Sequence, residues 1–264
     1  MKYTFPENRV LTSIQHRQTA LGIYVETPSS SVVELAAAAG MDFVRIDWCH
    51  NSMDLSLLEK CILAAERWNI TPMARIHFDH PDMARVLELG IMGVIIPDMD
   101  SAEKARAAVQ AVKFAPLGDR GLFSAARQSG YGSVSGADYI RWTNENVLIG
   151  VQIESREGIR HLDEILQVEG IDMVLSGRGD LSNSLGVPGQ KTHPDVLAAE
   201  DEIFSKAAAL GKCISPQLDA GSPALGSEVA QWNQRGAYAI SLGVDAALIK
   251  KAFSYLVVRA KKEL

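Results

Sequence analysis

The chain has 264 residues, of which 47% are hydrophobic, and its formal net charge is −6. That length and hydrophobic content are enough for one domain with a large buried core, and we expect residues 1–264 to form a single domain. The mildly acidic charge, without a block rich in lysine or arginine, argues against nucleic acid or an anionic membrane as the main partner.

Short apolar runs alternate with helix-like stretches along the chain. Eight of these runs, largely without polar alternation, are interpreted as buried strands. They are Leu21 to Val25, Phe43 to Ile46, Thr71 to Ala74, Gly93 to Ile96, Val147 to Ile153, Met173 to Leu175, Cys213 to Ser215 and Tyr238 to Ser241. Each is followed by a predicted helix or helix start, and a short helix is expected between Asn8 and Thr19, before the first strand.

Helical spacing and capping residues predict the remaining helices. They cover Val32 to Ala39, Leu55 to Trp68, Pro81 to Leu89, Ala102 to Val112, a stretch after Glu154, another after Asp180, Pro194 to Leu210, Ala224 to Arg235 and Ala246 to Ala260. Pro116 to Gly136 is interpreted as a long irregular loop, and such loops in compact domains are usually functional. Eight strand–helix units predict an α/β fold of the (β/α)8 TIM-barrel type, with a doubly wound open sheet as the alternative.

No targeting or membrane segment is visible in the sequence. The first twenty residues lack the apolar core of a signal peptide, and no apolar run approaches membrane-spanning length. The three cysteines, Cys49, Cys61 and Cys213, show neither even pairing nor C-x-x-C spacing, which is typical of a reducing compartment. We therefore expect a soluble cytoplasmic protein.

Polar side chains follow the predicted strands where the strands end. In a barrel these positions line the mouth that carries the active site. The set is mixed in chemical type and consists of Glu26, Asp47, His50, Arg75, Asp98, Glu154, Asp180, Gln217 and Asp219. This set of residues favours a catalytic or binding site at the mouth of the barrel.

Glu154 and Asp180 follow two consecutive buried strands. A carboxylate at such a place is costly unless something holds it. Two carboxylates and water suit Mg²⁺ or Mn²⁺, whereas no Cys/His cluster has zinc spacing. The alternative is that they cap the following helices, which is easier for Asp180 than for Glu154, because Ser155 already occupies the better cap position. We predict a divalent cation at this pair, chelated by a small 2-oxo acid whose enolate it stabilises.

Three further positions fit an oxo-acid site. Arg75 has the fork geometry that binds a carboxylate, or else it forms an internal salt bridge. The amides of Gly179 and Asp180 lie in a glycine-rich turn and can approach the same carboxylate. His50 directly follows a strand end and can relay a proton near neutral pH.

The sequence lacks the motifs that indicate a Schiff-base mechanism or a nucleotide cofactor. No lysine lies inside a predicted strand, which disfavours a Schiff-base aldolase. No dinucleotide fingerprint or Walker pattern is present.

At the level of motifs the chain resembles the HpcH/HpaI aldolase/citrate lyase family, in particular its metal-dependent class II pyruvate aldolases. The likeness runs from about Leu21 to Ala252. Its blocks are Ala36-Ala-Ala-Ala-Gly-Met-Asp-Phe43, Ile46-Asp-Trp-Cys-His50, Ala74-Arg75, Gln152-Ile-Glu-Ser-Arg-Glu157, Gly177-Arg-Gly-Asp-Leu-Ser182, Leu185-Gly-Val-Pro-Gly189 with His193-Pro194, and Leu242-Gly-Val-Asp245.

The resemblance implies a (β/α)8 barrel that assembles as a hexamer, a trimer of dimers, with its last helix swapped between subunits. It implies Mg²⁺, Mn²⁺ or Co²⁺ as the metal. It also implies roles for individual residues. Glu154 and Asp180 match the metal ligands, Arg75 matches the residue that binds and polarises pyruvate, and Gln152, Gly179 and Asp180 match substrate-binding positions. His50 matches the base of a dyad and Glu88 its carboxylate partner, while Asp47 matches a nearby active-site acid and Arg127 a loop arginine near the acceptor.

Three positions depart from the family's pattern. Glu88 stands where Asp is expected, Cys49 stands where Glu is usual, and Arg178-Gly179 replaces a usual Pro-Ala pair. The change at Glu88 bears on the geometry of the proton relay, whereas the other two departures bear on the substrate more than on the reaction type.

The predicted function is divalent-metal-dependent cleavage of a 4-hydroxy-2-oxo acid to pyruvate and an aldehyde through a metal-stabilised pyruvate enolate. The alternatives are oxaloacetate decarboxylation, lysis of a CoA thioester, and a non-catalytic oxo-acid-binding relative. A basic groove for the nucleotide of CoA is not evident, since the arginines are scattered.

Overall fold

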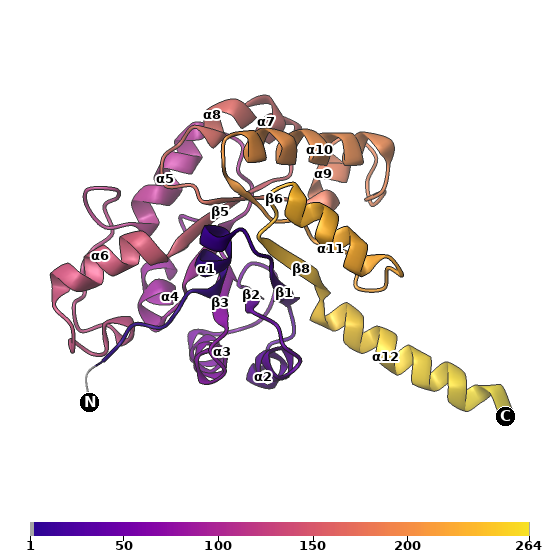
Figure 1. Cartoon of the computed structure of the whole chain (residues 1–264), viewed down its shortest axis with the longest axis horizontal. Helices are drawn as coiled ribbons and strands as arrows, with labels where there is room; N and C mark the ends of the chain where they lie inside the picture. The colour runs from indigo at the N-terminus through magenta and orange to yellow at the C-terminus, as the bar shows by residue number, and fades with distance from the viewer. Residues whose placement is uncertain (1–2, 264) are drawn as a thin grey trace.

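The computed structural model of the chain describes residues 3–263 and shows a (β/α)8 barrel (Figure 1). Its eight strands are β1 (Ala20–Val25), β2 (Phe43–Asp47), β3 (Thr71–Arg75), β4 (Gly93–Ile96), β5 (Leu148–Ile153), β6 (Met173–Ser176), β7 (Cys213–Ile214) and β8 (Ala239–Val244). All neighbouring strands are parallel, in the order β7-β6-β5-β4-β3-β2-β1-β8.

Closure of the sheet excludes the open-sheet alternative. Isolated parallel bridges join Ile214 to Ala237 and Gln217 to Ser241, so that the β7 segment meets the β8 segment. The amide of Ser241 donates to the carbonyl of Pro216 at 3.1 Å across the same seam. The carboxyl ends of all eight strands therefore surround one mouth.

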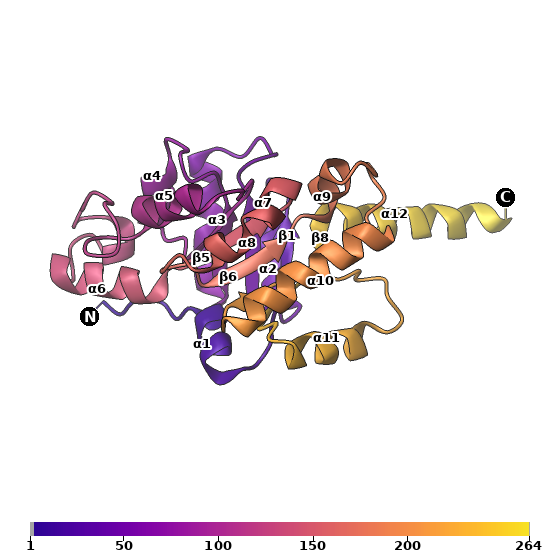
Figure 2. The same ribbon diagram turned by 90° about the horizontal axis from the view of Figure 1, so that it is seen from above.

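Helices surround the strands (Figure 2). They are α1 (Arg9–His16), α2 (Ser30–Ala38), α3 (Leu55–Arg67), α4 (Met83–Leu89), α5 (Ala102–Val112), α6 (Gly136–Asn146), α7 (Arg156–Arg160), α8 (Leu162–Leu166), α9 (Arg178–Ser184), α10 (Pro194–Ala209), α11 (Leu225–Gln234) and α12 (Asp245–Ala260), with short 3-10 turns η1 (Arg127–Ser129) and η2 (Lys261–Glu263).

Short polar side chains start several of these helices. Asp54 accepts a hydrogen bond from the amide of Leu57 at 2.8 Å, and Ser155 accepts one from Gly158 at 3.0 Å. Such caps satisfy backbone donors that the first helical turn leaves free. The Ser155 cap leaves two residues between β5 and α7, whereas seven residues separate β2 from α3.

The barrel has two apolar cores. The larger one lies between the strands and the outer helices. The smaller one fills the inside of the barrel, with Phe43, Met73 and Met173 among its buried members, and Leu11 and Ile14 of α1 pack against it. Side chains alternate between these cores along each strand, so inward-facing positions near the strand ends are the ones that reach the mouth.

The predicted strands are confirmed to within a few residues, but two helix predictions need correction. Residues 136–146 form α6, which the sequence interpretation left without an element, because Gly136 was taken only as the end of the loop. Its start is set by Ser135, which accepts from the amide of Asp138 at 3.1 Å. The stretch after Glu154 is two short helices, α7 and α8, with a break at His161.

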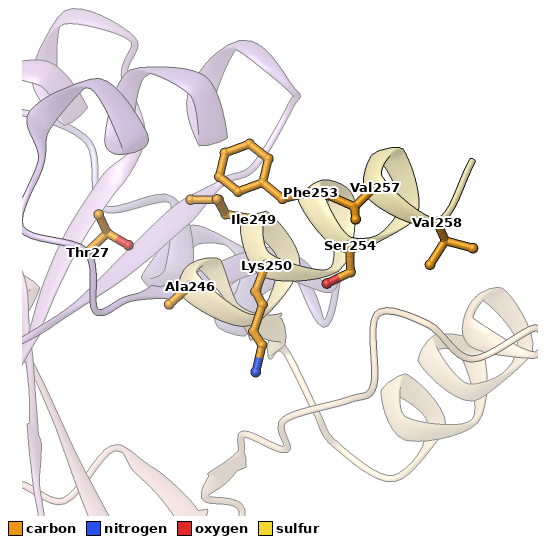
Figure 3. A pocket seen from close by; sticks show the side chains of 8 residues that line it. All are labelled: Thr27, Ala246, Ile249, Lys250, Phe253, Ser254, Val257 and Val258. Carbon is orange, nitrogen blue, oxygen red and sulfur yellow. The ribbon is translucent and has the colours of Figure 1, made fainter. Parts of the chain in front are cut away.

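Helix α12 extends away from the barrel and ends far from it (Figure 1). Its second half is exposed on all sides, and Phe253, Tyr255 and Leu256 each expose at least 60% of their surface. Thr27 and residues along the helix line a shallow, mainly apolar hollow, whose side chains are drawn in Figure 3. A helix with this much exposed apolar surface normally has a partner.

Within residues 3–263 no helix is long and apolar enough to cross a membrane. The three cysteines are free thiols, with Cys61 and Cys213 buried and Cys49 partly buried.

Candidate active site

A cavity of about 580 Å³ lies at the mouth of the barrel. Its wall is built from strand ends and the loops that follow them, and it is rich in charged side chains. The predicted residues that line it are Glu26, His50, Arg75, Gln152, Gly179, Asp180, Gln217 and Asp219. The tertiary structure therefore brings most of the strand-end set into one cavity, as the barrel geometry predicts.

Arg75 and Asp47 form a bidentate ion pair at the floor of the mouth. Their strands are paired with these two residues in register. Nε and Nη2 of Arg75 donate to the two carboxylate oxygens of Asp47 at 3.2 and 2.7 Å, and Asp47 is completely buried. Burial alone would lower the pKa of Arg75, but the hydrogen bonds and charge of Asp47 outweigh it and raise that pKa. Arg75 is thus a fixed cation with Nη1 left to bind a ligand.

Tyr24 lies between this arginine and a second one deeper in the barrel. The centre of its ring is 5.9 Å from the guanidinium carbon of Arg75 and 5.5 Å from that of Arg45. Arg45 is completely buried, and its Nε and Nη1 have no hydrogen-bond partner among the described residues. Burial lowers the pKa of Arg45. Tyr24 and Arg75 therefore line the cavity, whereas Arg45 and Asp47 are buried behind them, and the sequence interpretation did not identify Arg45 or Tyr24.

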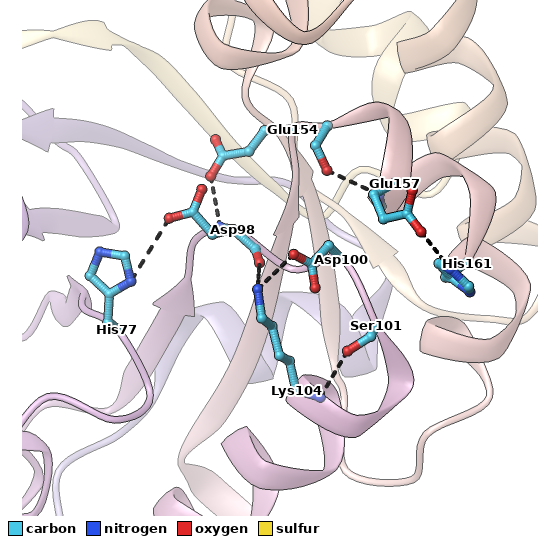
Figure 4. A network of polar contacts seen from close by, with 10 residues as sticks. His77, Asp98, Asp100, Ser101, Lys104, Glu154, Glu157 and His161 are labelled. Carbon is cyan, nitrogen blue, oxygen red and sulfur yellow. Dashed lines mark hydrogen bonds and ion pairs between the residues drawn. The ribbon is translucent and has the colours of Figure 1, made fainter.

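Glu154 directly follows β5 and is only 4% exposed. Its carboxylate accepts a hydrogen bond from the amide of Asp98 at 2.8 Å (Figure 4). It accepts another from the side chain of Gln152. Burial, together with the nearby charges of Asp98 and Asp180, raises the pKa of Glu154 to about 7. Glu154 therefore does not cap the following helix, since Ser155 has that role.

Asp180 lies in the first turn of α9 rather than before it. The N-cap of α9 is Gly177, and no side chain caps this helix. The capping alternative for Asp180 is therefore wrong. After burial, the negative charge of Asp180 is one of the causes that raise the pKa of Glu154, so Asp180 lies within electrostatic reach of the Glu154 carboxylate.

The backbone at Gly177 packs directly on the Glu154 carboxylate. A Cβ atom built on Gly177 would lie 2.1 Å from Oε2 of Glu154 and 2.5 Å from Nε2 of Gln152. Only glycine fits this approach. The loop from Ser176 to Asp180 and the end of β5 therefore form one packed unit.

These carboxylates fit a hard divalent cation. Burial, and after it the negative charges of Asp98 and Asp180, raise the pKa of Glu154, and a bound cation would stabilise its ionised form. Within residues 3–263 no group of three or more His, Cys, Asp or Glu side chains is arranged to hold a metal. A cation at Glu154 and Asp180 would consequently need water or substrate for its other positions, as Mg²⁺ commonly does.

Asp98 is held in an unusual backbone conformation beside Glu154. Its φ is +52°, a left-handed value that is uncommon for a residue other than glycine. Its carboxylate lies 3.9 Å from Nδ1 of His77, and Lys104 donates to its carbonyl oxygen at 3.3 Å (Figure 4). Strained residues of this kind cluster at functional sites, and here the strain presents the Asp98 amide to Glu154.

His50 is exposed at the rim of the cavity and contributes to the charge around Glu26. Glu88 and Arg127 lie elsewhere, in a second cavity of about 360 Å³ beside α4. Arg127 forms an ion pair with Glu66 and donates to the carbonyl of Leu89 at 2.8 Å. Within residues 3–263 no hydrogen bond or ion pair joins Glu88 to His50. Within one chain, therefore, His50 and Glu88 do not form the dyad that the family resemblance implies.

Cys49 follows the same strand end as Asp47. Burial raises the pKa of its thiol to about 11. Its amide donates to Asp47 at 2.9 Å. Cys49 is therefore a neutral neighbour of the site near pH 7 and not a nucleophile.

Arg178 and Glu200 also line the cavity, and the sequence interpretation missed Glu200. Glu200 lies on the otherwise apolar buried stripe of α10, with Val196, Ile203 and Phe204. A single acid at such a position is the signal that could have identified it, because buried acids need a partner.

Comparisons with known proteins agree with this geometry. The model of the HpcH/HpaI aldolase/citrate lyase family matches residues 20–252. A 2-keto-3-deoxy-L-rhamnonate aldolase of Salmonella typhi is 33% identical over 241 residues, 90% of this chain and 88% of that protein. A 4-hydroxy-2-oxo-heptane-1,7-dioate aldolase of Shigella sonnei is 30% identical over 255 residues, 96% of this chain and 95% of that protein.

Solved structures are similar over nearly the whole chain. The citrate synthase SbnG superposes with a TM-score of 0.85 at 29% identity, covering 96% of this chain and 97% of that one. An HpcH/HpaI aldolase from Desulfitobacterium hafniense gives a TM-score of 0.84 at 28% identity, covering 96% of each chain.

Proposed function

Since the chain belongs to the HpcH/HpaI aldolase/citrate lyase family of enzymes, we propose that it is a divalent-metal-dependent aldolase that cleaves a 4-hydroxy-2-oxo acid to pyruvate and an aldehyde. The observation that carries this proposal is a cavity lined by Arg75 and Asp180, with Asp47, the partner of Arg75, and the carboxylate of Glu154 buried next to these lining residues. An anion-binding cation and a cation-binding carboxylate pair in one mouth suit a 2-oxo acid, which offers both kinds of group.

Arg75 binds the keto acid in this proposal. Asp47 holds its guanidinium in place, so that the free Nη1 donates to the keto or carboxylate oxygen. The same donor then stabilises the negative charge of the pyruvate enolate. The amides of Gly179 and Asp180, with Gln152, are the proposed contacts for the rest of the oxo acid.

His50 is the proposed base. It accepts the proton of the C4 hydroxyl, directly or through water, as the C3–C4 bond breaks. The C4 carbonyl forms and leaves as the aldehyde, and the electron pair of the broken bond passes to the enolate. Protonation at C3 then completes pyruvate.

Glu154 and Asp180 are the residues that would hold a Mg²⁺, Mn²⁺ or Co²⁺ ion. When bound, such a cation withdraws electron density from the keto oxygen. Glu154 has to be ionised to do this, and its raised pKa means that proton and cation compete for it.

Pyruvate release from a panel of 4-hydroxy-2-oxo acids, measured with and without added Mn²⁺, tests the proposal. We expect turnover that EDTA abolishes and that Glu154→Gln reduces at least a hundredfold. Asp100→Asn is the matched control, because Asp100 is an acid near the same strand ends whose carboxylate pairs with Lys104 at 2.6 Å. Metal-independent turnover, or none with any member of the panel, would contradict the proposal.

We also propose a homo-oligomer, a hexamer built as a trimer of dimers, in which α12 packs on a neighbouring subunit. The exposed Phe253, Leu256 and Val257 support it. In such an assembly the neighbour can supply Glu88 and Arg127 to the mouth, which would explain why they lie apart from His50 here. Phe253→Asp should reduce the mass measured by light scattering, whereas Leu63→Asp on α3 should not. An unchanged mass for Phe253→Asp would speak against this assembly.

A cytoplasmic location is proposed from the three free cysteines. Recovery of the protein in an exported fraction would contradict it.

A further inference from the structure

Glu200 is joined to both residues that flank Gly177. Arg178 Nε donates to Oε1 of Glu200 at 2.9 Å, and Arg178 Nη2 donates to Oε2. The hydroxyl of Ser176 donates to Oε1 as well. Glu200 is 5% exposed, whereas the Arg178 side chain is 31% exposed and lines the cavity. One buried carboxylate on α10 therefore holds the last residue of β6 and the first residue of α9.

Among the described residues, no other side chain forms a hydrogen bond with the turn from Ser176 to Arg178, although the carbonyl of Gly177 accepts from the amide of Leu181 at 2.8 Å. No side chain caps α9, and the amide of Gly177 reaches the carbonyl of Ile153 only at 3.3 Å. Yet its position matters, because Gly177 packs against the Glu154 carboxylate with no room for a Cβ atom. If the backbone at Gly177 shifted by a few tenths of an ångström, it would press on the Glu154 carboxylate. Asp180, which follows in the same segment, would move as well.

Glu200 has no role of its own in the proposed mechanism, although it lines the cavity together with Arg178. Its hydrogen bonds with Arg178 are charge-assisted and bidentate, a geometry that fixes direction as well as distance. The pair therefore resists the motion that would separate Asp180 from Glu154.

We propose that Glu200 is a positioning residue of the active site, which acts through Arg178 and Ser176 to set the distance between the carboxylates of Glu154 and Asp180. This rests on the proposed function, in which those carboxylates hold a divalent cation. Outer partners of this kind typically change metal affinity by about 10- to 100-fold when they are removed.

The test is Mn²⁺ affinity, measured by titration calorimetry or electron paramagnetic resonance on the full chain without substrate. Glu200→Gln should weaken Mn²⁺ binding at least tenfold, and it should raise KM for the oxo acid. Asp201→Asn is the control, because it removes an exposed acid–arginine pair, with Arg235 at 2.6 Å, from the same helix. It should leave Mn²⁺ binding unchanged.

A double-mutant cycle of Glu200→Gln with Arg178→Met tests whether Glu200 acts on the metal site through Arg178. If Glu200 acts through Arg178, the double variant should bind Mn²⁺ no more weakly than the worse single variant. Additive losses would overturn that route. Should Glu200→Gln fail to fold, Arg178→Met alone makes the same tenfold prediction.

The outcomes separate this inference from the proposed function. Wild-type Mn²⁺ affinity in Glu200→Gln, with loss of binding in Glu154→Gln, overturns the role of Glu200 and leaves the metal site intact. A lower Tm in Glu200→Gln with unchanged Mn²⁺ affinity would mean a merely structural pair and would also overturn it. Wild-type protein that binds no Mn²⁺ would refute the metal site and the positioning role together.

Discussion

Replacing Glu154 by glutamine should change how the stability of the metal-free protein depends on pH. Burial, with Asp98 and Asp180 nearby, raises the pKa of this carboxyl from 4.5 to about 7 in the folded protein. Between those values the folded state keeps a proton that the unfolded state has lost. The free energy of unfolding therefore falls as pH rises from about 4.5 to about 7, and levels off above.

The size of this effect follows from the shift. Each pKa unit corresponds to about 1.4 kcal/mol, so the ionised Glu154 costs the folded protein about 3 kcal/mol at pH 8 relative to pH 4.5. Glutamine is uncharged and avoids this cost. It also fits the site, because Oε1 of Gln152 has no partner among the described residues and can accept from the new amide once Gln152 turns.

Urea unfolding in EDTA-containing buffer at pH 5 and pH 8, at one protein concentration, measures the effect. Between these two pH values wild type should lose about 2–3 kcal/mol more than Glu154→Gln. Saturating Mn²⁺ at pH 8 should then stabilise wild type but not the variant. Parallel pH profiles for the two proteins would refute the reasoning, because they would mean that Glu154 titrates normally.

Three other substitutions test the neighbouring contacts. Arg45→Met should stabilise the protein by about 1–3 kcal/mol in urea unfolding, because it removes a buried cation with two unpartnered donors; a destabilised variant would contradict this. Gly177→Ala should weaken Mn²⁺ binding at least tenfold, because its methyl group would overlap Glu154, whereas Gly179→Ala, where a Cβ would meet nothing closer than 3.8 Å, should bind Mn²⁺ normally. Arg75→Lys should raise KM for the oxo acid at least tenfold, since lysine cannot reproduce the bidentate pair with Asp47; an unchanged KM would exclude Arg75 from substrate binding.

Local signals in the sequence were sufficient for the barrel. Eight apolar runs, each ending near a polar residue and followed by capping chemistry, correspond to the eight strands within a few residues. The sequence interpretation missed helix α6 because the helix begins at a glycine, Gly136, and glycine is more typical of loops. The only local signal for this helix is the capping residue Ser135 before it. The break between α7 and α8 likewise has no strong signal in the sequence, because the residue at the break is His161 and not a proline or glycine.

The sequence predicted several of the residues that line the cavity, but not the contacts that they make. Strand-end position was enough to select Arg75, Glu154 and Asp180, because parallel strands all end at one mouth. It could not show whether Arg75 pairs with Asp47, nor that Asp180 lies inside a helix turn. Those outcomes depend on rotamers and loop paths.

What the sequence determined by itself was periodicity: where strands run, where they stop, and which polar residues stand at their ends. These are local properties, and they are sufficient once every strand is parallel. Only the tertiary structure decided that Glu200 reaches the β6–α9 turn, that Nε and Nη1 of Arg45 find no partner among the described residues, and that Glu88 lies away from His50. Such contacts join residues far apart in the chain, and packing distances that no local pattern encodes determine which of them form.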